Sequence, residues 1–201
     1  MTLFLVRHGE TTWNRDGTIQ GWADSSLTAR GRRQARAVGE RLAADGVDRL
    51  VVSDLQRTRE TAAALGEAGV DVAPTFDSAW RERGFGEYQG LTRAEVAARH
   101  DGYDPDGSLV AIEDVPEGES LTTLEKRVSE GLDAVAADRG GEETAVVVTH
   151  GGAIRAAVAA VTGRDLAVLA REWSPENCGL TAIDCVGERS VRFRDDTAHL
   201  E

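Results

Sequence analysis

The stretch LFLVRHGET, at residues 3–11, decides the fold. Its first four residues are a continuous apolar run, which is typical of a short strand buried on both faces of a sheet. His8 follows where this strand is expected to end. The stretch TAVVVTHGG, at residues 144–152, has the same arrangement: β-branched residues favour a buried strand, and His150 comes directly after it. Both stretches predict central strands that bring a histidine to the carboxyl edge of a sheet, where open α/β folds bind ligands.

Strand and helix patterns alternate over the rest of the chain. Thr28 is an expected N-cap for a helix over residues 29–44, which Gly46 is expected to end. This alternation predicts a single α/β domain over residues 1–201, a three-layer α/β/α sandwich with a mostly parallel central sheet. The other expected strands lie at 49–52, 70–76, 179–186 and 190–194. One further helix is expected behind a cap at Ser53 or Asp54, and others are expected at 92–100, at 121–138 behind Ser120, and at 151–163.

The chain is strongly acidic. Its 35 Asp and Glu residues outnumber 23 Lys and Arg residues, for a net charge of −12. This field would repel a nucleic-acid backbone, so no nucleic-acid partner is expected. Lys126 is the only lysine. The favoured interpretation is an ordinary solvated acidic surface, although an acidic, lysine-poor surface also resembles that of proteins adapted to high salt. A homodimer stays compatible with it.

Apolar length and cysteine spacing indicate a cytoplasmic protein. No apolar run approaches the roughly 20 residues that span a bilayer, and the N-terminal residues lack the basic region and cleavage site of a signal peptide. Neither a membrane partner nor secretion is therefore expected. Cys178 and Cys185 lie seven positions apart in an expected strand, too far to form a disulfide. Two free thiols agree with an intracellular location.

Three expected strand ends carry groups that bind anions. Arg7 and His8 follow the first strand, His150 follows the strand at 144–149, and Arg57 lies one turn into the helix after strand 49–52. A lone His-Gly pair is more typical of an ordinary turn, but two such pairs and an arginine could converge on one anion. His100 and His199 have no comparable context and are expected on a helix surface and in a frayed tail.

Two loops are expected near this edge. The stretch RERGFGEYQG, at 81–90, contains three glycines and is expected to be a structured loop. The stretch at 101–119 is acidic, rich in glycine and proline, and free of Lys and Arg, so we expect it to be a mobile flap.

Together these motifs resemble the histidine phosphatase superfamily, the phosphoglycerate mutase-like proteins. The matches occur in family order over most of the chain: LVRHGET at 5–11, WN at 13–14, GWADSSLTARGRRQA at 21–35, SDLQRTRETA at 53–62, RERGFGEYQG at 81–90 and VVTHGG at 147–152.

The resemblance implies a role for each matching residue. His8 would be the nucleophile that forms a phosphohistidine, and Glu82 would be the proton donor. Arg7, Arg57 and His150 would hold the phosphoryl oxygens, as fixed cations do for the charge of a phosphoryl transition state. The pocket would be completed by Asn14, Gln20, Gly21 and Gly151.

Other residues near these motifs have simpler interpretations. Outside the family pattern, Glu82 would be a solvated charge between two arginines. Arg59 diverges from Arg57 on the same helix and is expected at the surface. Trp13, Trp22 and Trp80 are expected to pack the walls of the site.

The resemblance implies a phosphatase for small phosphorylated metabolites, with two alternatives. A phosphoglycerate mutase needs basic residues that grip the substrate carboxylate, and the acidic stretch at 101–119 disfavours it. A non-catalytic phospholigand-binding module is disfavoured because all five central residues are present. The chain has no EF-hand, HExxH, zinc or P-loop spacing, so we expect no metal and no cofactor.

Overall fold

The central sheet has six strands in the order β3-β2-β4-β1-β5-β6. The computed structural model describes the chain except residues 101–102, 104–106, 113 and 138–142. The pairings β1–β4, β4–β2 and β2–β3 are parallel, whereas β5 and β6 add an antiparallel hairpin at one edge. The strands are β1 Thr2–Arg7, β2 Arg49–Val52, β3 Pro74–Phe76, β4 Thr144–Thr149, β5 Leu180–Asp184 and β6 Ser190–Asp196.

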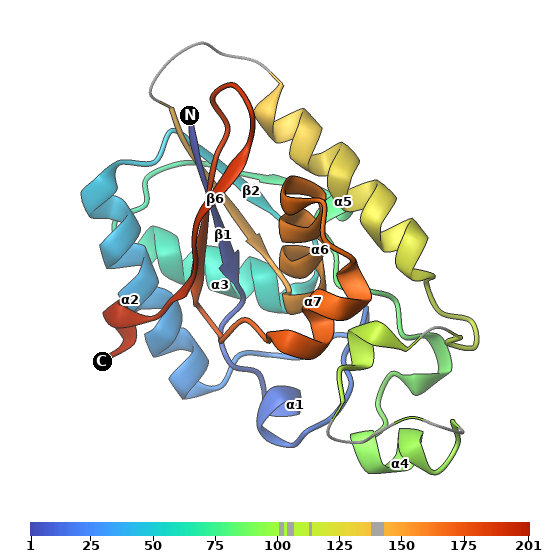
Figure 1. Ribbon diagram of the computed structural model, residues 1–201. Coiled ribbons are helices and arrows are strands. Elements are labelled where there is room, and N and C mark those ends of the chain that lie inside the picture. Colours follow the sequence, from blue (N-terminus) through green and yellow to red (C-terminus); the bar gives the residue numbers. More distant parts are fainter. Residues whose placement is uncertain (101–102, 104–106, 113, 138–142) are drawn as a thin grey trace.

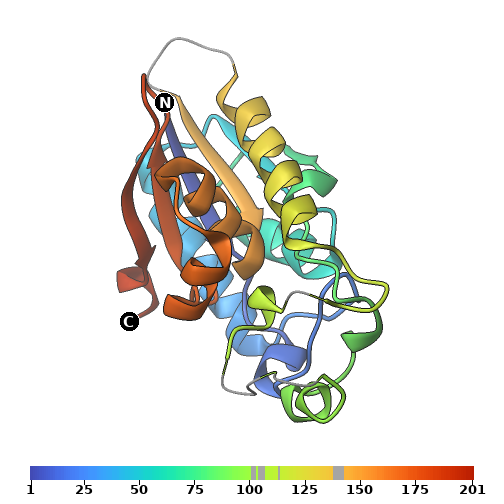
Figure 2. The same cartoon turned by 45° about the vertical axis from the view of Figure 1, so that its right-hand side comes forward.

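Helices cover both faces of the sheet, which confirms the predicted three-layer sandwich. Helices α2 and α3 pack on one face, and α5, α6 and α7 lie on the other (Figure 1, Figure 2). The described helices are α1 Thr12–Arg15, α2 Ala29–Asp45, α3 Gln56–Glu67, α4 Arg93–Ala97, α5 Leu121–Ala136, α6 Gly151–Thr162 and α7 Leu166–Glu172, with short 3-10 turns at Ser78–Trp80, Gly86–Tyr88, Leu109–Ala111 and Ala198–Leu200.

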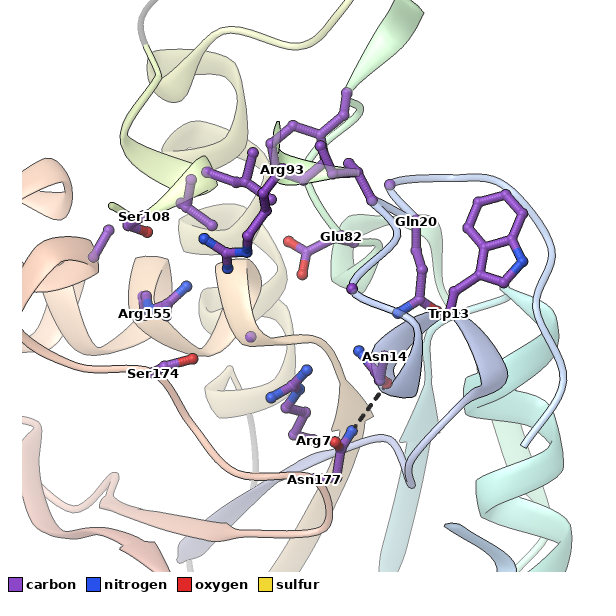
Figure 3. A pocket seen from close by; sticks show the side chains of 18 of the residues that line it. Arg7, Trp13, Asn14, Gln20, Glu82, Arg93, Ser108, Arg155, Ser174 and Asn177 are labelled. Carbon is purple, nitrogen blue, oxygen red and sulfur yellow. Dashed lines mark hydrogen bonds between the residues drawn. The ribbon is translucent and has the colours of Figure 1, made fainter. Parts of the chain in front are cut away.

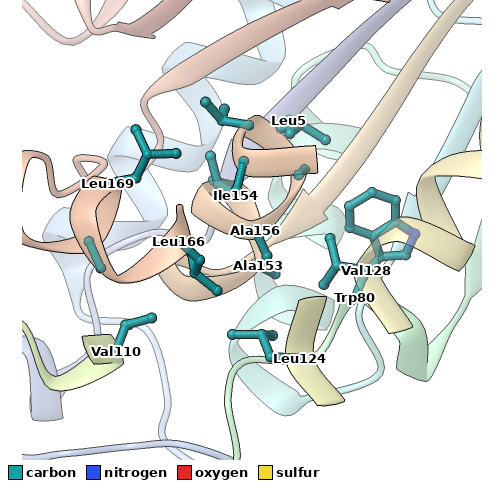
Figure 4. Close-up of a cluster of buried hydrophobic side chains, with 14 of the residues drawn as sticks. Leu5, Trp80, Val110, Leu124, Val128, Ala153, Ile154, Ala156, Leu166 and Leu169 are labelled. Atoms are coloured by element: carbon teal, nitrogen blue, oxygen red, sulfur yellow. The ribbon is translucent and has the colours of Figure 1, made fainter. Parts of the chain in front are cut away.

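The apolar run of β1 supplies both cores. Leu3 and Leu5 pack with α5, α6 and α7, in the cluster that Figure 4 shows. Phe4 and Val6 point to the opposite face, where they pack against α2 and α3. Successive side chains of a strand point to opposite faces, so a central strand covered on both sides has to be apolar throughout.

Most expected boundaries agree with the structure. Thr28 and Ser120 cap α2 and α5 through their side chains, and Gly46 ends α2. Cys178 and Cys185 are free. The expected strand at 70–76 pairs only over its last three residues, and α7 is an element that the sequence pattern did not predict.

The expected cap of α3 is wrong. The helix begins at Gln56 behind Leu55, which makes no side-chain capping bond. The Ser53 hydroxyl lies 2.8 Å from Nε2 of His150, and the Asp54 carboxylate pairs with Arg81 at 2.6 Å. Tertiary partners have therefore taken the two side chains that could have capped the helix.

The expected flap is only partly described. Asp101, Asp104, Asp106 and Glu113 lie outside the described residues, as does residue 138 at the expected end of the helix now assigned as α5. The described residues around Leu109–Ala111 bury Val110 and Ile112. This part of the flap packs on the α6 side of the molecule (Figure 4).

Candidate active site

The carboxyl ends of β1, β4 and β2 bring His8, His150 and Ser53 together. The His8 backbone N–H donates to the Thr149 carbonyl, and the Ser53 N–H donates to the Val148 carbonyl, so pairing continues past the strand ends. The two imidazole rings lie 5.2 Å apart between centroids. His8 lines a cavity of about 750 Å³.

His8 presents one free ring nitrogen. Its Nδ1 lies 2.8 Å from the carbonyl oxygen of Gly9. Because a carbonyl only accepts hydrogen bonds, Nδ1 carries the proton and Nε2 keeps a lone pair. Burial, with Arg57 and Arg7 nearby, holds the pKa of His8 well below its usual value of 6.5. The ring is therefore neutral at pH 7 and able to act as a nucleophile.

Two arginines, the half-buried Arg7 and the buried Arg57, flank His8. Arg7 donates to the Pro175 carbonyl at 2.5 Å, while its Nε is buried without a partner among the described residues. Arg57 donates to the Gly21 carbonyl at 2.6 Å and the Ala23 carbonyl at 3.1 Å. Burial lowers the pKa of Arg57 to about 10, so it stays charged at neutral pH. Two fixed cations beside a neutral imidazole form an anion site.

His150 lies behind His8, and its side chain does not line the cavity. Its Nδ1 accepts from Nε of Arg57 at 3.2 Å, and its Nε2 faces the Ser53 hydroxyl at 2.8 Å. A guanidinium only donates, so the neutral ring carries its proton on Nε2. Burial first, then Arg57 and His8, hold the pKa of His150 well below 6.5. Its expected contact with phosphoryl oxygens stays a prediction, since both ring nitrogens face protein groups here.

Two amides extend the site. The Gln20 Oε1 faces the hydroxyls of Ser25 at 2.5 Å and Thr11 at 3.0 Å. The Asn14 Oδ1 accepts from the Thr11 N–H at 3.2 Å and from Nδ2 of Asn177 at 3.3 Å. With both oxygens engaged, the two NH₂ groups are left to donate into the cavity, toward which both side chains project (Figure 3).

Glu82 faces the same cavity (Figure 3). One carboxylate oxygen accepts from the N–H of Arg83 at 2.7 Å, and the other accepts from the N–H of Gly152 at 3.1 Å, at the start of α6. The side chain is half-buried, so Glu82 is not a solvated loop charge. Gly21 and Gly151 also line the cavity, which brings eight of the nine predicted site residues to its wall.

The family profile described as histidine phosphatase superfamily (branch 1) matches residues 3–195, nearly the whole chain. The chain belongs to the histidine phosphatase superfamily. It is 34% identical over 197 residues to a Salmonella arizonae protein named "Probable phosphoglycerate mutase GpmB", covering 92% of this chain and 85% of that one.

Solved histidine phosphatases have the same fold. Bacillus stearothermophilus YhfR is 30% identical, with a TM-score of 0.88 over 100% of this chain and 99% of that one. The mycobacterial glucosyl-3-phosphoglycerate phosphatase solved in complex with VO3 is 29% identical, with a TM-score of 0.85 over 96% and 98% of the two chains.

The cavity of this histidine phosphatase contains polar residues that the sequence interpretation missed. Arg155 is 6% exposed, donates to the Trp173 carbonyl at 2.6 Å, and has a pKa that burial lowers to about 10. It follows Gly151 by four positions on α6, a helical spacing that could have predicted it. Arg93 and Asn177 also line the cavity. Arg93 comes from α4, a helix that the sequence predicted without its place beside the cavity, and Asn177 comes from the segment between α7 and β5.

Residues around the site only partly match their expected places. Trp13 lines the cavity, and Trp22 donates from its indole to the Glu82 carbonyl at 2.6 Å. Trp80 is fully buried in the core beneath α5. Arg59 is exposed, as predicted, and stacks on Phe76.

The two remaining histidines were placed wrongly. His100 is half-buried beyond the end of α4, where its Nδ1 lies 3.0 Å from the Tyr88 hydroxyl. His199 is held in the last 3-10 turn by the Cys178 carbonyl, 2.9 Å from its Nε2. Each contact joins two segments that no helical or strand periodicity connects, so the sequence pattern could not predict it.

The described residues contain neither a metal-ion cluster nor a membrane-spanning helix. No cluster of three or more His, Cys, Asp or Glu side chains suited to a metal ion occurs there. No described helix is long and apolar enough to cross a membrane.

Proposed function

We propose that this histidine phosphatase hydrolyses small phosphate monoesters without a metal ion, through a phosphohistidine on His8. The observation that carries the proposal is the free Nε2 of His8 in a cavity that also contains Arg7, Arg57 and Glu82. Nε2 attacks phosphorus, the N–P bond forms, and the bond from phosphorus to the ester oxygen breaks. Protonated Glu82 gives its proton to that oxygen.

The second half of the cycle reverses these roles. Water attacks the phosphohistidine, Glu82 takes its proton, and the N–P bond breaks to release phosphate. Arg7 and Arg57 neutralise the charge on the equatorial oxygens in both steps, because their positions are fixed before the substrate arrives. The NH₂ groups of Asn14 and Gln20 supply further donors.

A phosphoglycerate mutase is the second candidate, and two arginines favour it. Arg93 and Arg155 line the cavity beyond the phosphate-binding residues, from α4 and α6 (Figure 3). These two arginines could bind a substrate carboxylate, so the lack of basic residues at 101–119 is a weaker argument against a mutase than it was from the sequence. The name carried by the Salmonella relative supports the mutase, and the likeness to a mycobacterial phosphatase supports hydrolysis.

One experiment separates these candidates. With excess EDTA present, the purified protein is expected to release phosphate from p-nitrophenyl phosphate and from a panel of phosphorylated metabolites. The measurement is phosphate release compared with interconversion of 2- and 3-phosphoglycerate after priming with the bisphosphate. Interconversion that outruns release would replace hydrolysis by mutase activity, and loss of all activity on EDTA addition would contradict metal independence.

Gly152→Ala tests the placement of Glu82. A Cβ at Gly152 would lie 2.1 Å from the Glu82 carboxylate, so the carboxylate has to move. We expect kcat/KM for alkyl phosphates to fall on the order of 10-fold, with a smaller loss for p-nitrophenyl phosphate, whose leaving group needs no proton. A Cβ at Gly151 meets nothing closer than 3.8 Å, so Gly151→Ala should keep the ratio of the two kcat/KM values. If Gly152→Ala and Gly151→Ala had the same ratio of kcat/KM for alkyl phosphates to kcat/KM for p-nitrophenyl phosphate, this geometry would be contradicted.

A further inference from the structure

An ion pair lies behind Glu82, away from the cavity wall. Arg127 on α5 donates to both carboxylate oxygens of Glu119, from Nε at 2.6 Å and from Nη2 at 2.7 Å. The two side chains are only 17% and 6% exposed. Neither residue lines the cavity at His8. The pair therefore has the fixed bidentate geometry of a shielded Arg–carboxylate contact without any access to substrate.

Arg127 also holds the backbone of the segment that carries Glu82. Its Nη1 donates to the carbonyls of Ala79 at 2.9 Å and Arg81 at 2.7 Å, and its Nη2 donates to the Glu82 carbonyl at 2.8 Å. With the two bonds to Glu119, these contacts use all five guanidinium N–H donors. The backbone from Ala79 to Glu82 is thus fixed from one side by a single side chain.

Arg83 connects this network to the residues above the cavity. It is fully buried, and its Nε donates to the Glu119 carbonyl at 2.7 Å. Its Nη1 donates to the carbonyls of Val110 at 2.9 Å and Ile112 at 2.5 Å. Val110 lines the cavity. The Glu82 segment, the Glu119–Arg127 pair and this part of the cavity wall therefore share one hydrogen-bonded frame.

We propose that Glu119 and Arg127 are positioning residues that set where the Glu82 carboxylate stands against the leaving oxygen. The proposal rests on the proposed function, in which Glu82 transfers the proton. Arg127 fixes the Glu82 carbonyl, while the N–H groups of Arg83 and Gly152 hold its carboxylate. If Arg127 holds the Glu82 carbonyl less firmly, the Glu82 carboxylate should be misplaced. A shift of about 1 Å in a reacting group costs on the order of 100-fold in rate.

The test uses Arg127→Lys and Glu119→Gln. Lysine keeps the charge but cannot make five fixed bonds, and glutamine keeps the shape of Glu119 but loses its charge. We expect kcat/KM for an alkyl phosphate such as glycerol phosphate to fall about 10-fold or more, against less than about 3-fold for p-nitrophenyl phosphate. The Kd for inorganic phosphate should stay unchanged, because Arg7 and Arg57 are untouched. Thermal unfolding followed by circular dichroism checks that each variant is folded, and either variant alone carries the test.

Arg49→Lys is the matched control. Arg49 lies within 2.9 Å of Glu143 and donates to the Val135 carbonyl, near the other end of α5. It is a similarly shielded arginine with a carboxylate and a backbone partner, but it is distant from Glu82. It should leave the ratio of the two kcat/KM values at the wild-type level.

A double variant separates the positioning role from the role of Glu82. In a Glu82→Gln background, Arg127→Lys should change that ratio no further, since its effect acts through the missing carboxyl group. Equal losses on both esters, or full additivity with Glu82→Gln, would overturn the positioning role while Glu82 keeps its own. If Glu82→Gln itself left the ratio unchanged, the proposed function would fail first and the inference with it.

Discussion

His8→Asn is expected to abolish turnover, with a loss on the order of 10⁵-fold or more in kcat. The Nε2 of His8 is the protein atom that bonds to phosphorus in the proposed mechanism, and the asparagine amide is not nucleophilic. Its short polar side chain is still able to reach the Gly9 carbonyl, which Nδ1 of His8 contacts at 2.8 Å. The measurement is phosphate release from p-nitrophenyl phosphate, together with binding of inorganic phosphate by calorimetry.

Binding and chemistry should separate in this variant. Arg7 and Arg57 remain in place, so His8→Asn should still bind inorganic phosphate. His199→Gln is the control, since His199 does not line the cavity and its Nε2 lies 2.9 Å from the Cys178 carbonyl, so the variant should keep wild-type turnover. A variant at position 8 that binds phosphate and turns over within about 10-fold of wild type would remove His8 from the mechanism.

Glu82→Gln is expected to lower kcat/KM for alkyl phosphates by about 100- to 1000-fold, the range usual for a lost general acid. Glutamine retains the size of the side chain and one oxygen, which can accept from the N–H of either Arg83 or Gly152, but it has no proton to give to an alkoxide. With p-nitrophenyl phosphate, kcat/KM should fall far less, because nitrophenolate leaves unprotonated. Phosphorylation would then outrun hydrolysis, and a burst of nitrophenolate should appear in stopped flow.

The control for this variant is Glu87→Gln. Glu87 is an exposed glutamate of the same loop whose carboxylate faces solvent. It should leave both esters at wild-type rates. Equal losses for alkyl and nitrophenyl esters in Glu82→Gln would show that Glu82 shapes the site without transferring a proton.

The strands and the centre of the site follow from local sequence. The run at residues 3–6 must be apolar because β1 is covered on both faces, and His8 has to follow it at the carboxyl edge. Arg57 could be predicted because it lies near the start of the helix that follows β2. Helix α7 carried an overlooked signal, since Asp165 caps it and Leu166 and Leu169 are buried on its inner face.

The remaining features depend on contacts between distant segments. Serine is a residue type that often caps helices, but the Ser53 hydroxyl forms a hydrogen bond with His150, 97 positions away. Asn177 reaches the His8 carbonyl at 2.9 Å only because β5 pairs with β1. Glu82 owes its place to Gly152 and to Arg127, which lie 70 and 45 positions from it. No periodicity in the loop at 81–90 encodes those partners.

The proposed mechanism requires that phosphorus becomes bonded to His8. Wild-type protein mixed with p-nitrophenyl phosphate, quenched within milliseconds at alkaline pH where phosphohistidine survives, and digested for mass spectrometry tests it directly. One phosphoryl group is expected on His8, and it should form and decay at rates consistent with kcat. Full turnover with His8 unmodified at every time point, or a phosphoryl group on another residue with the same kinetics, would contradict it.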